Sequence, residues 1–192
     1  MPNQYENEAN YLAHYNTTGP EIWSDTKGKV THFVTGIGTG GTITGVSQYL
    51  KERNKDVKVI AVEAQRNHHL QGLRNLEESM MPDVLKKRKD LIDEWIKVSD
   101  KDAFAQVKMA GEKEELLIGP SSGAVLHATS ELVKRKVEGT IVAIFADDGQ
   151  KYLSVYSELG VFTFEEYKNL LNKTKYLRNF DLLNKSKNSL LN

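Results

Sequence analysis

The fold is decided by one stretch of the sequence, Thr31-His-Phe-Val-Thr-Gly-Ile-Gly-Thr-Gly-Gly-Thr-Ile-Thr-Gly-Val-Ser-Gln-Tyr-Leu50. Its pattern predicts a short apolar strand, a glycine-rich turn and an amphipathic helix that packs on a sheet. Glycines let backbone N–H groups approach a ligand closely, and the helix N-terminus adds the positive end of its dipole, so we expect a phosphate-type anion site. Thr39 and Thr42 can add hydroxyl donors. The apolar residues of the helix fall at helical spacing: Ile43, Val46, Tyr49 and Leu50.

Composition narrows the class of protein. The chain has 192 residues, enough for one sizeable core, and its 26 Lys and Arg balance its 26 Asp and Glu. We therefore expect no nucleic-acid partner. Because the chain has no cysteine, disulfides, thiolate metal sites and a cysteine nucleophile are excluded, and we expect no metal site. No apolar run is long enough for a membrane span and no secretory signal is visible, so we expect a cytoplasmic protein with no membrane contact.

The chain reads as an α/β protein with a mostly parallel open sheet and helices on both faces. Strands at 30–35 and 57–62 flank the helix 41–53, which makes a βαβ unit. Polar, glycine-containing turns end three predicted strands, and such turns gather at the carboxyl edge of a parallel sheet, where ligands bind. We also expect a helix at 7–14 and a second helix that begins after Thr18, which would act as its N-cap. Further helices are expected at 100–115 and 120–137, and further strands at 95–98, 116–118 and 140–146.

The glycine-rich turn allows two interpretations of the ligand that it binds. Gly36–Gly41 matches the G-x-G-x-x-G pattern and Glu63 follows 22 residues later, as in an NAD(P)-binding Rossmann domain. Against this reading, helical sequence precedes the strand, and Thr39 and Thr42 suit a compact phosphate monoester. A non-catalytic half-protein that acts as a binding partner is a further alternative.

Five segments resemble the cysteine synthase and cystathionine β-synthase family of pyridoxal-phosphate enzymes, in the family's order. They are residues 4–10, 14–23, 36–46, 119–124 and 147–154. The resemblance implies the tryptophan-synthase-β-like fold (fold type II), present here only in its C-terminal part. It also implies β-replacement on an activated serine, O-acetylserine or O-phosphoserine, with a sulfur donor, in cysteine biosynthesis.

The same resemblance implies roles for individual residues. In the family, one loop holds the cofactor phosphate, a serine faces the pyridine nitrogen, and other positions contact the substrate. Arg74 resembles an arginine that pairs with the phosphate of O-phosphoserine, although an ordinary surface role is an equal alternative. The positions are Gly38, Thr39, Gly40, Gly41 and Thr42 for the phosphate, Ser121 for the ring, and Gln4, Gly72 and Arg74 for the substrate.

The family's Schiff-base lysine motif and its asparagine loop do not occur in this sequence, so we assign no catalytic residue and expect the chain to be inactive alone. We expect residues 1–167 to form the C-terminal part of the large domain, with 1–15 leading in, and 168–192 to form an Asn/Lys-rich peripheral or partly disordered tail. An exposed sheet edge would invite pairing, so we expect a homodimer.

Overall fold

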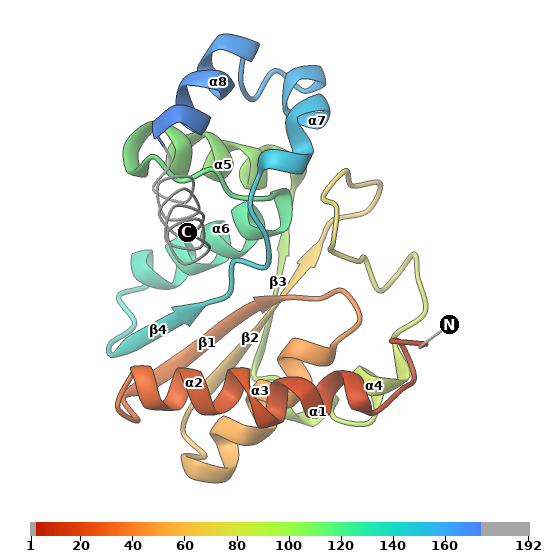
Figure 1. Cartoon of the computed structure of the whole chain (residues 1–192). Coiled ribbons are helices and arrows are strands. Elements are labelled where there is room, and N and C mark those ends of the chain that lie inside the picture. Colours follow the sequence, from red (N-terminus) through yellow and green to blue (C-terminus); the bar gives the residue numbers. More distant parts are fainter. Residues whose placement is uncertain (1–2, 174–192) are drawn as a thin grey trace, which may run out of the picture.

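Parallel strands form the centre of the fold (Figure 1). The computed structural model describes residues 3–173, and in this part of the chain the sheet has four strands in the order β3-β2-β1-β4. All neighbouring pairs are parallel. The strands are β1 (Val30–Gly36), β2 (Lys58–Ala64), β3 (Glu94–Val98) and β4 (Thr140–Ala143).

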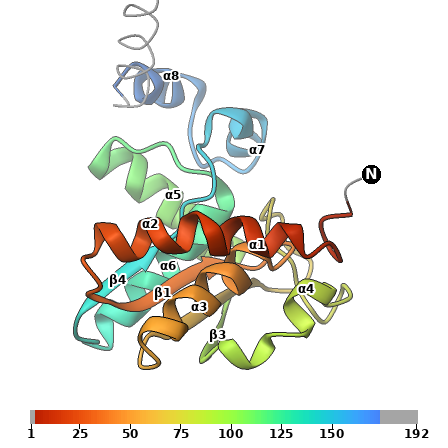
Figure 2. The same cartoon turned by 60° about the horizontal axis from the view of Figure 1, so that its bottom comes forward.

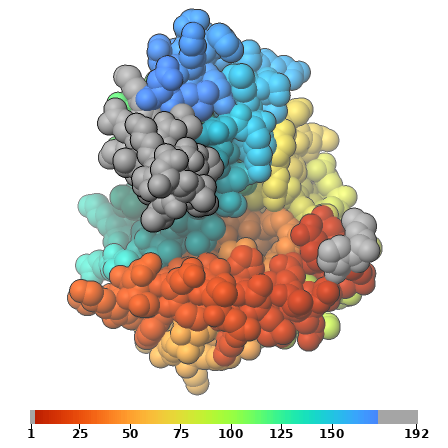
Figure 3. Space-filling model, in the orientation of Figure 1, coloured from red at the N-terminus to blue at the C-terminus, as the bar shows by residue number. Residues whose placement is uncertain are grey.

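Helices cover both faces of this sheet (Figures 1 and 2). One face carries α1 (Ala9–Asn16), α2 (Thr18–Asp25) and α3 (Gly41–Arg53), and the other carries α5 (Asp100–Glu114) and α6 (Pro120–Lys134). Figure 3 shows α1 and α2, in red and orange, spread across the lower part of one face of the molecule. The remaining elements are α4 (Asp83–Lys86), η1 (Lys89–Leu91), η2 (Gln150–Tyr152), α7 (Leu153–Glu158) and α8 (Phe164–Lys173).

The central strands are buried on both sides because their side chains alternate between two apolar clusters. Phe33 of β1 packs with α3, whereas the next residue, Val34, packs with α5 and α6. Both are fully buried. This burial explains why β1 and β2 read as nearly continuous apolar runs. The expected α/β class, with a parallel sheet and helices on both faces, is confirmed.

The helix α3 has the predicted bounds, but its four apolar residues do not all face the sheet. Ile43, Val46 and Leu50 are buried in the cluster beneath α3. Tyr49 instead lies against α1 and α2, with its ring 5.6 Å from that of Tyr15 in an edge-on contact. The predicted cap Thr18 is also wrong, since it is the first residue of α2.

The predicted strand at 116–118 is not part of the sheet. Ile118 forms only an isolated antiparallel bridge with Asp148, and the Leu117 carbonyl accepts a hydrogen bond from Gly149 N at 2.9 Å. This segment is therefore held by the turn at 147–149. The strand β4 ends at Ala143, three residues earlier than predicted. Ile144 N still donates to the Val34 carbonyl of β1 at 3.0 Å, and the chain then continues toward that bridge.

The C-terminal helix α8 crosses the expected boundary between residues 167 and 168. Its residues Tyr167 and Leu170 are buried in the cluster with α5 and α6. The rest of the expected tail, residues 174–192, lies outside the described residues. Within residues 3–173 no helix is long and apolar enough to span a membrane.

Candidate functional site

The turn between β1 and α3 exposes the start of a helix. Gly40, at the N-cap of α3, has a φ of +85°, a conformation that side-chain-bearing residues rarely adopt. Among the residues that the structure describes, the N-cap residue itself makes no side-chain hydrogen bond to the helix, and only Gly41 N donates to a side chain of the turn, Thr39 Oγ1 at 3.4 Å. The other N–H groups of the first turn remain available to an anion. The Gly72 carbonyl lies so close to Gly38 that a Cβ there would be 2.8 Å from the oxygen. The turn is thus enclosed from one side by the loop around Gly72.

A cavity of about 150 Å³ joins this turn to the start of α6. All six residues predicted for cofactor binding line it, together with Gly72. The structure therefore brings together residues that lie up to 83 positions apart, from Gly38 to Ser121. The lining residues are Thr35, Gly36, Gly38, Thr39, Gly40, Gly41, Thr42, Gly72, Leu73, Ser121, Val125, Ile144 and Ala146.

Ser121 reaches the cavity from the first turn of α6. Proline at the first helical position suits this start, because its missing N–H would have no partner there. The turn is held by Gly119 N, which donates to the Asp147 carbonyl at 3.1 Å. Ser121 is 7% exposed, and no hydrogen bond joins its hydroxyl to another residue in the described part of the chain. A buried hydroxyl without a protein partner is suited to a ligand.

Side chains of the turn at 147–152 brace that arrangement. The Tyr152 hydroxyl donates to Asp147 Oδ2 at 2.7 Å, and Lys151 Nζ lies 2.8 Å from the same oxygen. Burial and the Asp147 carboxylate raise the pKa of Tyr152 to about 12, so the phenol keeps its proton. Asp148 Oδ1 accepts from Gln150 N at 2.8 Å, as a turn-capping residue does.

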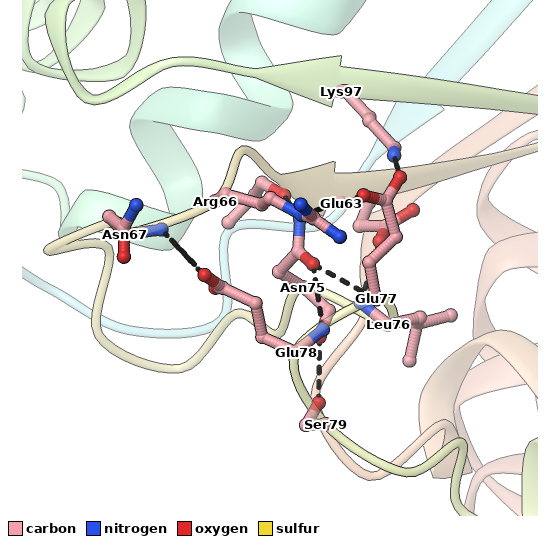
Figure 4. Close-up of polar contacts among 10 residues, drawn as sticks. Glu63, Arg66, Asn67, Asn75, Leu76, Glu77, Glu78, Ser79 and Lys97 are labelled. Atoms are coloured by element: carbon pink, nitrogen blue, oxygen red, sulfur yellow. Dashed lines mark hydrogen bonds and ion pairs between the residues drawn. The ribbon is translucent and has the colours of Figure 1, made fainter.

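The loop that carries Gly72 is fixed to the end of β2 by two buried side chains (Figure 4). Glu63 Oε1 accepts from Leu76 N at 2.7 Å, and Asn75 Nδ2 donates to the Ala64 carbonyl at 2.9 Å. Glu63 is only 5% exposed. Its carboxylate therefore positions this loop and is not presented to a ribose, which removes the residue on which the dinucleotide reading depended.

The same loop carries ion pairs at its surface. Figure 4 shows Glu77 near Lys97, with which it forms an ion pair, and Glu78 accepting from the backbone N of Asn67 at 3.1 Å. Arg66 pairs with Glu77 at 2.8 Å. These exposed pairs contribute little stability. The loop is held instead by Glu63, by Asn75 and by backbone hydrogen bonds of Arg74, whose N donates to the Ile37 carbonyl at 2.8 Å.

Two predicted substrate residues lie beside the cavity and do not line it. Arg74 places its guanidinium carbon 4.5 Å from the centre of the Tyr5 ring. Tyr5 follows Gln4, which is exposed and whose carbonyl accepts from Asn10 Nδ2 at 2.6 Å. The structure thus places Gln4 and Arg74 on adjoining segments.

The sequence reasoning missed two residues of α1 that contact the glycine turn. Asn10 Nδ2 donates to Thr39 Oγ1 at 2.9 Å, and His14 Nε2 lies 3.2 Å from Thr42 Oγ1. Burial lowers the pKa of His14. Both residues stand in segments that resemble the family, Asn10 in 4–10 and His14 in 14–23, but the resemblance gave neither of them a role. Their separation by one helical turn has meaning only once α1 is known to pack on α3.

Other histidines form no metal site. His69 Nδ1 lies 2.8 Å from Asp100 Oδ2, which also accepts from the His69 backbone N. Between residues 3 and 173 no group of three or more His, Cys, Asp or Glu is arranged to hold a metal ion.

Comparison with known proteins identifies the family. The model of the pyridoxal-phosphate dependent enzymes matches residues 1–147 of the chain. The chain belongs to the pyridoxal-phosphate dependent enzyme family. This family binds pyridoxal phosphate, and the finding confirms the resemblance, the fold type and the expected cofactor.

Relatives in this pyridoxal-phosphate family include several cysteine synthases. A cysteine synthase from Aquifex aeolicus is 42% identical over 156 residues, covering 79% of this chain and 47% of that protein. Cysteine synthase B from Escherichia coli is 35% identical over 164 residues, covering 85% of this chain and 52% of that protein. The solved structure of a cysteine synthase from Entamoeba histolytica has a TM-score of 0.75 at 32% identity, covering 89% of this chain and 53% of that protein. The chain spans about half the length of the curated relatives it matches.

The residues of the cavity fit the phosphate end of the cofactor. A volume of about 150 Å³ is below the ~300–1,000 Å³ of complete small-molecule sites, and it suits one phosphate with part of a ring. The available N–H groups of α3 and the hydroxyls of Thr39 and Thr42 match the oxygens of such a group.

Proposed function

We propose that this chain supplies the cofactor-phosphate site of a cysteine synthase-type enzyme, which replaces the leaving group of an activated serine by a sulfur nucleophile. The single observation that carries the proposal is the cavity in which the glycine turn and Ser121 meet. It occurs in a chain whose relatives are cysteine synthases. Neither a dinucleotide-binding domain nor a non-catalytic binding partner is favoured by these relatives or by the buried Glu63.

The residues of the cavity divide between the two ends of the cofactor. The glycine turn and its threonines, Gly38–Thr42, bind the phosphate. Ser121 donates its hydroxyl proton to the pyridine nitrogen and does not protonate it, which moderates electron withdrawal. When bound, pyridoxal phosphate supplies an electron sink for negative charge that develops on the substrate.

Substrate residues lie next to the phosphate end. Gln4 would bind the carboxylate of the amino acid, and Gly72 leaves room for the substrate at the mouth of the cavity. Arg74 would select a phosphorylated serine over an acetylated one by pairing with its phosphate. Replacing Arg74 by Gln should then weaken binding of O-phosphoserine and leave O-acetylserine unchanged; equal effects on both would assign Arg74 to the surface.

Binding of a cofactor analogue tests the proposed site. Pyridoxine 5'-phosphate lacks the aldehyde and cannot react with lysine side chains, and its fluorescence reports binding. We expect it to bind at least about tenfold more tightly than pyridoxine, because several N–H and O–H donors contact the phosphate. Equal affinity for the two compounds would overturn the proposal.

We further propose that the chain alone is catalytically incomplete, since the lysine motif of the family has no match in it. The purified 192-residue chain, given pyridoxal phosphate, O-acetylserine and sulfide, should form no cysteine above the background without protein. Robust cysteine formation with no second polypeptide present would contradict this proposal.

The homodimer remains a proposal that rests on the sheet edge. The strand β4 is last in the strand order, and its side chains are partly exposed. An edge strand offers unpaired backbone groups to another chain. Light scattering should show a dimer, and a monomer at high concentration would contradict it. The cytoplasmic location also stays a prediction.

A further inference from the structure

The two threonines of the glycine turn each have a partner on α1. This helix lies over α3 on one face of the sheet (Figure 2). Asn10 and His14, one turn apart on α1, point toward the turn and contact Thr39 and Thr42 respectively. Both threonines line the cavity, whereas Asn10 and His14 do not. These residues therefore act on the cavity only through the threonine hydroxyls.

The orientation of the Asn10 amide is set by its neighbours. Its Nδ2 lies 2.6 Å from the Gln4 carbonyl, which can only accept a hydrogen bond, so the nitrogen and not the oxygen must face that carbonyl. The second proton on Nδ2 is then donated to Thr39 Oγ1 at 2.9 Å. A Cβ on residue 41 would lie 2.0 Å from the amide oxygen, so glycine at this position leaves room for the Asn10 amide.

Thr39 Oγ1 consequently receives two donors. One is Asn10 Nδ2 at 2.9 Å, and the other is the backbone N of Gly41 at 3.4 Å. Since a hydroxyl oxygen has two lone pairs and one proton, the proton of Thr39 is left to be donated elsewhere. Because Thr39 lines the cavity, an anion there is the natural acceptor.

His14 has a similar relation to Thr42. Its Nδ1 lies 3.0 Å from Thr18 Oγ1, and its Nε2 lies 3.2 Å from Thr42 Oγ1. If Thr18 donates to Nδ1, the neutral ring carries its proton on Nε2 and donates to Thr42. Thr42 then also keeps its own proton for the cavity.

We propose that Asn10 and His14 are positioning residues that turn the hydroxyl protons of Thr39 and Thr42 toward the phosphate in the cavity. Because Asn10 also binds the Gln4 carbonyl, it connects the phosphate site to the segment predicted to bind the substrate carboxylate. The inference deepens the proposed function and rests on it, since the anion it concerns is the cofactor phosphate.

Affinity measurements in a double-mutant cycle test the proposed role of Asn10. The measured quantity is the ratio of the dissociation constants of pyridoxine and pyridoxine 5'-phosphate. Asn10→Leu should lower this ratio about three- to tenfold, the worth of one neutral hydrogen bond. In a Thr39→Val background the same substitution should have no further effect. An equal loss in both backgrounds, or an equal loss of affinity for both compounds, would overturn the role of Asn10.

The proposed role of His14 is tested by a rescue substitution and by spectroscopy. His14→Leu should lower the ratio about three- to tenfold, whereas His14→Gln, whose amide can donate from a similar place, should restore it to within about twofold. Correlation of the ring nitrogens with the ring protons by NMR at pH 8 should show the Nε2–H tautomer. The Nδ1–H tautomer, or failure of glutamine to rescue, would overturn the role of His14.

The outcomes for the two proposals are distinct. If the unmodified chain does not prefer pyridoxine 5'-phosphate to pyridoxine, the proposed function and the inference both fall. If it does prefer the phosphorylated compound, and the variants on α1 keep that preference, only the inference falls. Circular dichroism of each variant shows that the ratio is measured on folded protein.

Discussion

Two turns meet at the cavity, and they are built in different ways. The first leaves β1 of the sheet, contains Gly40 at a φ of +85°, and is backed by α1. The second leaves a segment outside the sheet, opens α6 with Pro120, and is held by the Asp147 carbonyl. The first turn presents several backbone N–H groups with two hydroxyls, and the second presents the single hydroxyl of Ser121. The first is therefore suited to a whole anion, and the second to one atom of a ring.

The largest effect should come from adding one methyl group to the first turn. A Cβ at Gly41 would lie 2.0 Å from Asn10 Oδ1, so Gly41→Ala must displace either Asn10 or the start of α3. We expect affinity for pyridoxine 5'-phosphate to fall about 30-fold or more, equivalent to losing one hydrogen bond to a charged group. Isothermal titration calorimetry measures this change.

Gly160→Ala is the matched control for this substitution. Nothing lies within 4 Å of a Cβ at residue 160, and its φ of +64° makes alanine cost stability only. Affinity for the analogue should stay unchanged in the control. A Gly41→Ala variant that binds as tightly as the control would show that α1 does not constrain the first turn.

The second turn should respond to substitution through stability. The Tyr156 hydroxyl donates to the Ile118 carbonyl at 2.5 Å, and the residue is fully buried. Tyr156→Phe leaves that carbonyl without its partner, so the free energy of unfolding in urea should fall by about 1–3 kcal/mol. Affinity for inorganic phosphate should stay unchanged. Loss of phosphate affinity with intact stability would show that both turns bind the anion.

The sequence predicted the first turn better than the second, for a physical reason. The unit from β1 to β2 is local: its apolar periods and glycines lie within residues 30–64, and the helix bounds 41–53 were correct. The segment 116–118 has a similar apolar run, but its backbone partners lie thirty residues away at 147–149. Short apolar runs do not reveal whether they join a sheet, because this depends on non-local hydrogen bonds.

Only those residues of the site that belong to motifs with an assigned role could be predicted from the sequence. The glycine turn and Ser121 stand in motifs, and they line one cavity. Asn10 and His14 stand in no motif that names a role, and their contacts depend on how α1 packs on α3. Glu63 stands where the dinucleotide-binding motif has its ribose-binding acid, but its carboxylate accepts a hydrogen bond from Leu76 N and holds the loop.

Removal of the Ser121 hydroxyl should separate the ring end from the phosphate end. Ser121→Ala should lower affinity for pyridoxine 5'-phosphate about two- to tenfold, because the ring nitrogen loses one neutral hydrogen bond. Affinity for inorganic phosphate should not change. Ser122→Ala is the matched control: its hydroxyl lies 3.4 Å from the Asp147 carbonyl, so it should affect stability only. Equal effects of both substitutions on the analogue would contradict the assignment of Ser121.

The smallest effect concerns the pH dependence of the first turn. Burial holds the pKa of His14 below its ordinary value of 6.5, so the unfolded chain binds this proton more readily than the folded one. Stability from neutral His14 is therefore fully present above pH 6.5 and decreases as the pH falls toward the folded pKa. His14→Gln should flatten the decline in the free energy of unfolding, measured in urea, between pH 7 and 5, because glutamine does not titrate there. An unchanged decline in this variant would assign the acid sensitivity to groups other than the histidine behind Thr42.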